Sequence, residues 1–273
     1  DPKDHFRVEH DITVLQAGLG GSVKYLRSRL SGGQWFGLGS SFVLSLTGEA
    51  GYILGFGKQR FGTDTTGAVY PLDKVRLTDR FFLGEPQLRG FDIRGVGPRI
   101  VRSYYDANGA LLNTNRTDDA LGGRLYYLAH AEIEIPLGSG ARELGLRPSI
   151  FADVGAVGKI RRPSLVNGTG IYNGTCSIAD SSGVIQSSNN QASQPGSAGC
   201  AIYTPPTGGS VSYNGNGFKE TYLGDSLSPR LSVGFGVNWN SPFGPFRIDI
   251  AKALLKQPGD DTKLITFNIG TQF

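Results

Sequence analysis

The sequence has no methionine, only two cysteines and three histidines, and no long hydrophobic run. No segment approaches the ~20 consecutive apolar residues that a transmembrane helix needs. Hydrophobic residues make up 38% of the 273 residues, which is low for a soluble globular domain of this size. A membrane β-barrel fits this composition better, because its strands alternate apolar and polar residues and bury no thick core.

The scarcity of histidine and the small net charge narrow the possible functions. His5, His10 and His130 are too far apart to suggest a metal site. Neither of the two long polar segments contains a histidine, which argues against a hydrolytic enzyme, since such sites nearly always use one. The positive residues behind the net charge of +4 are scattered, which argues against nucleic-acid binding. We therefore expect no enzymatic activity, no cofactor, no metal and no nucleic-acid partner.

The two cysteines, Cys176 and Cys200, fall in one polar segment. Paired cysteines of this kind indicate a disulfide and an oxidising compartment. Two free thiols are the alternative.

Eight segments alternate apolar and polar residues with the period of two that is typical of β-strands. The first covers residues 6–14 and the second 23–30, with a tight turn expected at Ser31-Gly32-Gly33-Gln34. The third, residues 36–56, has the strongest pattern and exceeds the ~9–11 residues that cross a bilayer as a tilted strand. The other five predicted strands cover residues 124–135, 146–156, 231–239, 246–253 and 265–273.

The lengths of the connections alternate along the chain. Short turns follow the second, fourth and sixth strands, and longer connections follow the others, including loops at about 57–120 and 158–222. Outer-membrane barrels show this asymmetry, with short periplasmic turns and long extracellular loops. A soluble β-sandwich would give similar alternation within strands but not this asymmetry. The sequence therefore predicts an all-β, antiparallel transmembrane barrel region over residues 1–273.

A candidate site centres on Leu88-Arg89-Gly90-Phe91 in the first long loop. Glu132 and Asp153 lie on the polar faces of two neighbouring predicted strands, and a guanidinium between two carboxylates forms charge-assisted hydrogen bonds. Gly90 would let the backbone approach the barrel wall, and Phe91 could wedge the tip of the loop. We expect Arg89 to dock between these carboxylates inside the barrel. In the alternative, Arg89 is exposed to solvent and the carboxylates only hydrate a polar lumen.

Five short motifs in order carry a resemblance to a known family. They are Leu88-Arg89-Gly90-Phe91 followed by Val96-Gly97-Pro98, then Asp118-Asp119-Ala120-Leu121-Gly122-Gly123, Phe151-Ala152-Asp153-Val154-Gly155, Ser241-Pro242-Phe243-Gly244-Pro245 and Phe267-Asn268-Ile269-Gly270 with a terminal aromatic residue. With these motifs the chain resembles the BamA family of outer-membrane β-barrel assembly proteins. The resemblance runs from about residue 6 to residue 273 and is weakest in the loops.

The resemblance implies a location in the outer membrane of a Gram-negative-type bacterium. That family's barrel has sixteen strands preceded by POTRA repeats, so the sequence is expected to hold the C-terminal half of the barrel. The implied function is to fold and insert other β-barrel proteins through an openable strand seam, with Arg89, Glu132 and Asp153 docking the loop. The residues expected at the seam are Phe267, Asn268, Gly270 and Phe273 of the last strand, where Gly270 would weaken pairing.

The expected partners are the outer-membrane bilayer, unfolded barrel substrates and periplasmic lipoprotein subunits of an assembly complex. One alternative is a two-partner secretion transporter of the same superfamily, which shares the arginine motif. The Asp118–Gly123 and Ser241–Pro245 motifs favour assembly over export. A second alternative, an outer-membrane barrel enzyme, would need an acid–base pair among the loop residues.

Overall fold

The computed structural model describes residues 5–16, 24–39, 42–56, 58–63, 67–105, 110–112, 116–138, 145–165, 174–193, 197–214, 218–241 and 244–269. Within these ranges the chain is all-β apart from two short 3-10 helices, η1 (Leu77–Asp79) and η2 (Ser197–Cys200). Neither helix has the length or the apolar character to cross a membrane.

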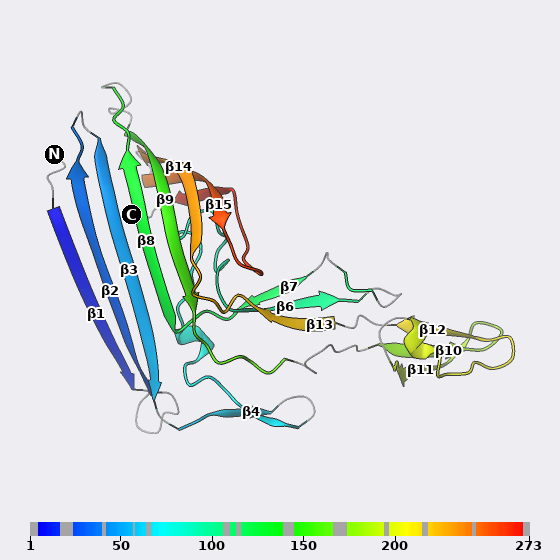
Figure 1. The fold of residues 1–273 in the computed structure, drawn as a ribbon. Coiled ribbons are helices and arrows are strands. Elements are labelled where there is room, and N and C mark those ends of the chain that lie inside the picture. Colours follow the sequence, from blue (N-terminus) through cyan, green and yellow to red (C-terminus); the bar gives the residue numbers. More distant parts are fainter. Residues whose placement is uncertain are drawn as a thin grey trace.

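Eight antiparallel strands form one curved sheet (Figure 1). They follow one another in the sheet in their order along the chain, as the sequence predicted. These strands are β1 (His5–Gln16), β2 (Lys24–Gly37), β3 (Val43–Phe56), β8 (Leu125–Glu134), β9 (Leu146–Gly158), β14 (Arg230–Ser241), β15 (Gly244–Leu255) and β16 (Ile265–Ile269). Within the described residues β1 and β16 are the two edges and do not pair with each other, so the sheet is open.

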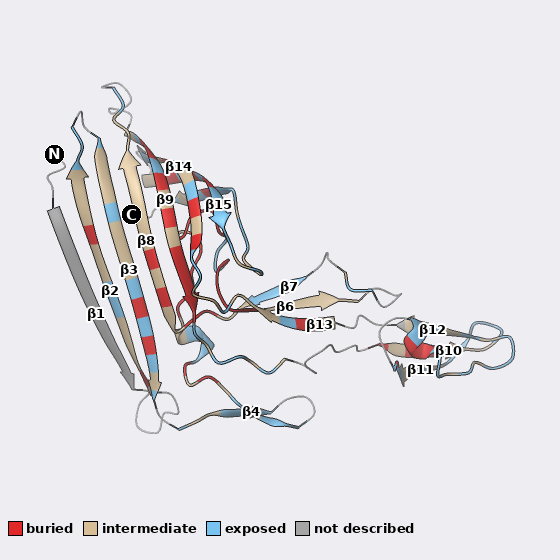
Figure 2. Cartoon of the chain, viewed as in Figure 1, coloured by how far each residue is buried: buried red, intermediate tan, exposed pale blue. Residues whose placement is uncertain are grey.

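The two faces of this sheet reverse the pattern of a soluble protein. Large apolar side chains are exposed on the outer face, such as Ile150 at 50% and Phe267 at 54%. Polar side chains of the opposite face are buried, among them Ser149, Asp153 and Asp249. Figure 2 shows buried residues gathered on β9 in the middle of the sheet. An apolar outer face around a polar interior is the arrangement of a membrane barrel.

The hairpin between β2 and β3 lies further along the chain than the sequence predicted. The predicted turn at residues 31–34 is wrong: Gly32 and Gly33 lie inside β2, which continues to Gly37. The turn follows instead, closed by a hydrogen bond from Leu38 N to Phe42 O of 3.0 Å. A Cβ on Gly33 would lie 2.5 Å from Cη2 of Trp35. Glycine here therefore makes room for an indole ring and not for a turn.

The two long connections leave the same end of the sheet and carry strands of their own (Figure 1). The connection from β3 to β8 holds β4 (Phe61–Thr63), β5 (Val69–Pro71), η1, β6 (Arg99–Tyr104) and β7 (Thr117–Ala120). The connection from β9 to β14 holds β10 (Thr175–Ala179), β11 (Ile185–Gln191), η2, β12 (Ser210–Asn214) and β13 (Phe218–Leu223). Because β13 pairs with β6, the two connections share a three-stranded sheet, β13-β6-β7. From the sequence, loops were expected at about 57–120 and 158–222, and the strands within these connections were not predicted.

Candidate functional site

The segment of residues 84–97, which we call the arginine loop, lies against the inner face of the sheet. A hydrogen bond of 3.2 Å from Val96 N to Leu83 O holds its two ends together. Three apolar side chains of the loop are buried, namely Leu88, Phe91 and Val96. They form one cluster with the preceding Leu83 and with side chains of β8 and β9, which are Tyr126, Leu128 and Val157. Removing this apolar surface from water favours the loop's position on the wall.

Arg89 makes ion pairs with both of the carboxylates that the sequence singled out. Its Nε and Nη2 donate to Oδ2 and Oδ1 of Asp153 at 2.6 and 2.5 Å, and its Nη1 donates to Oε2 of Glu132 at 2.6 Å. The backbone N–H of Arg89 also donates to Asp153, at 3.2 Å. The guanidinium carbon lies 3.4 Å from the ring centroid of Phe151. The side chain is only 8% exposed, so water competes little for these contacts.

Gly90 and Phe91 lie where the loop touches the wall. Gly90 has φ +85°, and a Cβ there would lie 3.0 Å from Cβ of Ser232 and 3.3 Å from Cβ of Ala251. Its backbone is therefore both left-handed and close to β14 and β15, two conditions that favour glycine. Phe91 is fully buried in the loop cluster. These positions bring Arg89 within reach of β8 and β9.

Two charged residues of the site were missed by the sequence analysis. Arg247 and Asp249 lie on the inner face of β15, and Arg247 Nε donates to both carboxylate oxygens of Asp249 at 2.9 Å. Arg247 also reaches across to Glu132, with Nη2 3.1 Å from Oε1. Asp249 Oδ1 lies 4.0 Å from Nη1 of Arg89. The signal that could have identified the two residues was their alternation with apolar neighbours, Phe246, Ile248 and Ile250.

The arrangement is a chain of alternating charges that joins the loop to three wall strands. His130 extends it, with Nδ1 3.0 Å from Oδ1 of Asp153. A cavity of about 860 Å³ beside the cluster is lined by Arg89, Glu132, Arg247 and Asp249 among others. In the described part of the chain no cluster of His, Cys, Asp and Glu side chains is arranged to hold a metal ion. The contacts that join these residues are ion pairs, and withdrawal of Arg89 would leave the buried carboxylates with too few cations.

The last strand of the sheet, β16, pairs with β15 from Ile250↔Ile265 to Phe246↔Ile269. Phe267 is on the exposed apolar face, and its ring lies 6.0 Å from that of Phe246. Asn268 pairs in register with Arg247. Gly270 and Phe273, the other two residues expected at the seam, lie outside the described residues.

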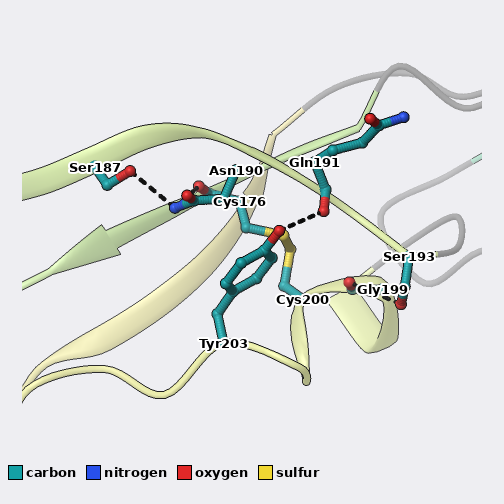
Figure 3. The surroundings of a disulfide bond; sticks show 8 residues. All are labelled: Cys176, Ser187, Asn190, Gln191, Ser193, Gly199, Cys200 and Tyr203. Carbon is teal, nitrogen blue, oxygen red and sulfur yellow. Dashed lines mark hydrogen bonds between the residues drawn. A yellow bond between two sulfur atoms is a disulfide. The ribbon is translucent and has the colours of Figure 1, made fainter.

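Cys176 and Cys200 form a disulfide, with their Cα atoms 5.6 Å apart. It ties β10 to η2 (Figure 3). Strand β10 belongs to a small three-stranded sheet, β11-β10-β12, that lies well away from the eight-stranded sheet (Figure 1). Tyr203 closes the same region with a hydrogen bond to the backbone oxygen of Gln191 of 2.8 Å. The disulfide and a few buried side chains form a separate core here.

Comparison with known proteins gives a consistent picture. The model of the Omp85 superfamily domain matches residues 2–273. The chain is 31% identical over 258 residues to the outer membrane protein assembly factor BamA of Neorickettsia risticii, covering 94% of this chain and 23% of that protein. It is 24% identical over 257 residues to the factor of the same name from Neisseria meningitidis serogroup B, covering 93% and 24%.

A solved structure agrees on the fold. The crystal structure of BamA from Haemophilus ducreyi lacking POTRA domains 1–3 superimposes with a TM-score of 0.54 at 20% identity, covering 96% of this chain and 37% of that one. The predicted fold class and the predicted location in the outer membrane of Gram-negative bacteria are confirmed. The chain spans about a quarter of the length of the two curated relatives.

Proposed function

The chain belongs to the Omp85 superfamily, and on that premise we propose that it is part of an outer-membrane assembly factor that folds and inserts β-barrel proteins. Support comes from the two curated relatives, both named as outer membrane protein assembly factors and not as enzymes. Their names also favour assembly over export of a single polypeptide. We propose a non-enzymatic role, with the lipid bilayer and unfolded barrel proteins as partners and periplasmic lipoproteins as accessory subunits.

The eight strands form one portion of a larger barrel in this proposal. The open sheet supports it, because β1 and β16 each present an edge without a strand partner among the described residues. Further strands of a longer chain would close the wall next to β1, with the seam at β16. Unpaired backbone groups at such an edge can pair with an incoming strand, which is the means of insertion that we propose. The long connections would face the outside of the cell.

The arginine loop anchors the interior of this barrel. The observation that carries this part of the proposal is the bidentate contact of Arg89 with Asp153, shared with Glu132 and largely shielded from water. Lysine could keep the charge but could not form the same planar, two-pronged contact. We therefore propose that a docked Arg89 is required for efficient assembly.

The test uses the full-length protein that contains this chain, reconstituted into liposomes and supplied with an unfolded outer-membrane barrel protein. The folded fraction of the substrate is followed over time by its altered migration in unheated gels. Arg89→Lys should slow folding by about tenfold or more, since losing one buried charge-assisted contact costs more than ~1.4 kcal/mol. Arg102→Lys is the matched control, because Arg102 pairs with Glu220 at 2.7 Å outside the wall.

Three results would contradict parts of the proposal. Wild-type liposomes that fold the substrate no faster than empty liposomes would contradict the assembly function. Transfer of a soluble polypeptide across the membrane would favour the export alternative. Equal rates for Arg89→Lys and the wild type would leave assembly in place and remove the role of the docked arginine.

A further inference from the structure

We propose that the connector between β15 and β16, residues 256–264, couples the arginine loop to β16, with Asp261 and Lys263 as its positioning residues. The position of the loop on the wall would then set the position of β16. The inference rests on the proposed function for its consequence, since β16 is the strand whose edge would receive substrate. Its structural basis is a set of contacts between two segments that are far apart in the sequence.

The arginine loop and the connector pair through their backbones in the manner of two antiparallel strands. Phe91 and Thr262 form an isolated antiparallel bridge. Three backbone hydrogen bonds accompany it: Asp92 N to Asp261 O at 3.0 Å, Asp261 N to Gly95 O at 2.8 Å and Lys263 N to Gly90 O at 3.2 Å. Arg89 precedes the first of these paired residues by one position. Any displacement of Arg89 from the wall would therefore reach the connector directly.

Side chains reinforce the same pairing on both sides. Lys263 Nζ donates to Oε2 of Glu85 at 2.9 Å, at the start of the arginine loop. This hydrogen bond raises the pKa of the Lys263 ammonium above its ordinary value. Asp261 Oδ2 accepts from Nη1 of Arg99 at 2.6 Å, just beyond the end of the loop. The connector is thus held to the loop at both of the loop's ends.

The connector is equally well tied to the wall and to β16. Asp260 forms a two-pronged ion pair with Arg230 at the start of β14, with distances of 2.9 and 3.2 Å, and both side chains are fully buried. Directly after Lys263, the backbone oxygen of Leu264 accepts from Ala251 N at 2.9 Å, and β16 begins at Ile265. The chain therefore passes from pairing with the arginine loop to pairing with β15 within one residue. Only Leu264 lies between Lys263, which pairs with the arginine loop, and the first residue of β16.

The test is hydrogen–deuterium exchange of the full-length protein in lipid nanodiscs, read by mass spectrometry for peptides of β16 and of the arginine loop. Arg89→Lys weakens docking, and Lys263→Gln removes the Glu85 ion pair without touching the buried cluster. Lys263 is 40% exposed, so this variant should fold even if Arg89→Lys does not. Arg89→Lys should raise exchange in β16 by about tenfold, and Lys263→Gln, whose ion pair is partly exposed, by about two- to fivefold.

Arg102→Gln is the matched control, because its ion pair with Glu220 has nearly the same exposure, 35% and 5% against 40% and 6% for Lys263 and Glu85. It should leave exchange in β16 unchanged. Exchange in β16 that stays at the wild-type value while the arginine loop exchanges faster would overturn the coupling. An equal rise in the control would also overturn it. Slower assembly by Arg89→Lys with unchanged β16 exchange would contradict the coupling alone and leave the proposed function in place.

Discussion

The charges around Arg89 explain why a loop with so many polar groups lies inside the sheet. Taking a guanidinium out of water is costly unless its donors are paired with good geometry. Arg89 meets that condition through Asp153 and Glu132, and the ring of Phe151 covers the face of the guanidinium. Arg247 then supplies a second cation to Glu132. No single pair accounts for the site, since each carboxylate serves more than one donor.

Gly90 offers a test of how closely the loop must approach the wall. Gly90→Ala should lower the free energy of unfolding for two reasons. Alanine in the left-handed conformation costs ~1 kcal/mol, and its methyl group would crowd Ser232 and Ala251 at a further cost of ~1–3 kcal/mol. Gly67→Ala is the matched control, with φ +86° against +85° but no atom within 4 Å of the added Cβ. Urea unfolding in lipid, followed by tryptophan fluorescence, measures both. Equal losses would mean that the loop does not press against the wall.

At the scale of elements, period-two alternation identified all eight wall strands, because the lipid and the lumen impose opposite demands on their two faces. The predicted turn at residues 31–34 was wrong because a pair of glycines was interpreted as a turn signal. Gly32 and Gly33 resemble a turn in sequence, yet they lie opposite Gly48 and Thr47 of β3 and give space to Trp35. The role of these glycines depends on their pairing with β3 and on the packing of the indole ring, and neither can be predicted from the residues next to them in the sequence.

Gly33→Ala should displace the ring of Trp35, since the added methyl group would lie 2.5–3.0 Å from Trp35 and Thr47 atoms. We expect a loss of ~1–3 kcal/mol and a shift of the tryptophan emission. Gly48→Ala, on the adjacent strand, is the control because its nearest neighbour would be the backbone oxygen of Leu128 at 3.8 Å. An unchanged emission in Gly33→Ala would mean that Gly33 does not make room for the indole ring.

The disulfide acts on one element and not on the whole barrel. It joins cysteines 24 positions apart, so its removal in the double variant Cys176→Ala and Cys200→Ala should cost the β11-β10-β12 sheet ~3 kcal/mol. Limited proteolysis should then cut within residues 174–214, while the eight strands remain resistant. The contacts of that small sheet lie mostly within itself, which is why the effect should stay local. Cleavage of the wall strands in the same variant would contradict this separation.

At the scale of the whole molecule, the sequence predicted the class of fold and the meeting of Arg89 with Glu132 and Asp153. It could do so because strand register places alternate residues on one face, and the resemblance supplied the loop. It did not reveal Arg247 and Asp249, the β13-β6-β7 sheet, or the pairing of the arginine loop with residues 261–263. These depend on how the sheet curves and how two distant connections pack, which alternation along one strand does not report.

Among the described residues, the two edges of the open sheet, β1 and β16, have no strand partner on their outer side. The arginine loop lies on the inner side of the sheet and pairs with residues 261–263, directly before β16. In the proposed function, docking of Arg89 on the wall and pairing of an incoming strand at the edge of β16 are coupled through residues 261–263.

The most direct measurement is a double-mutant cycle on the rate of barrel insertion by the full-length protein in liposomes, with Arg89→Ala, Asp153→Asn and both together. If the contact itself supports assembly, each single variant should slow insertion by about tenfold or more, and the double variant should be no slower than the worse single variant. Arg102→Ala and Glu220→Gln form the matched pair outside the wall. A double variant whose loss equals the product of the two single losses would contradict a role for the ion pair in assembly, because the two residues would then act independently.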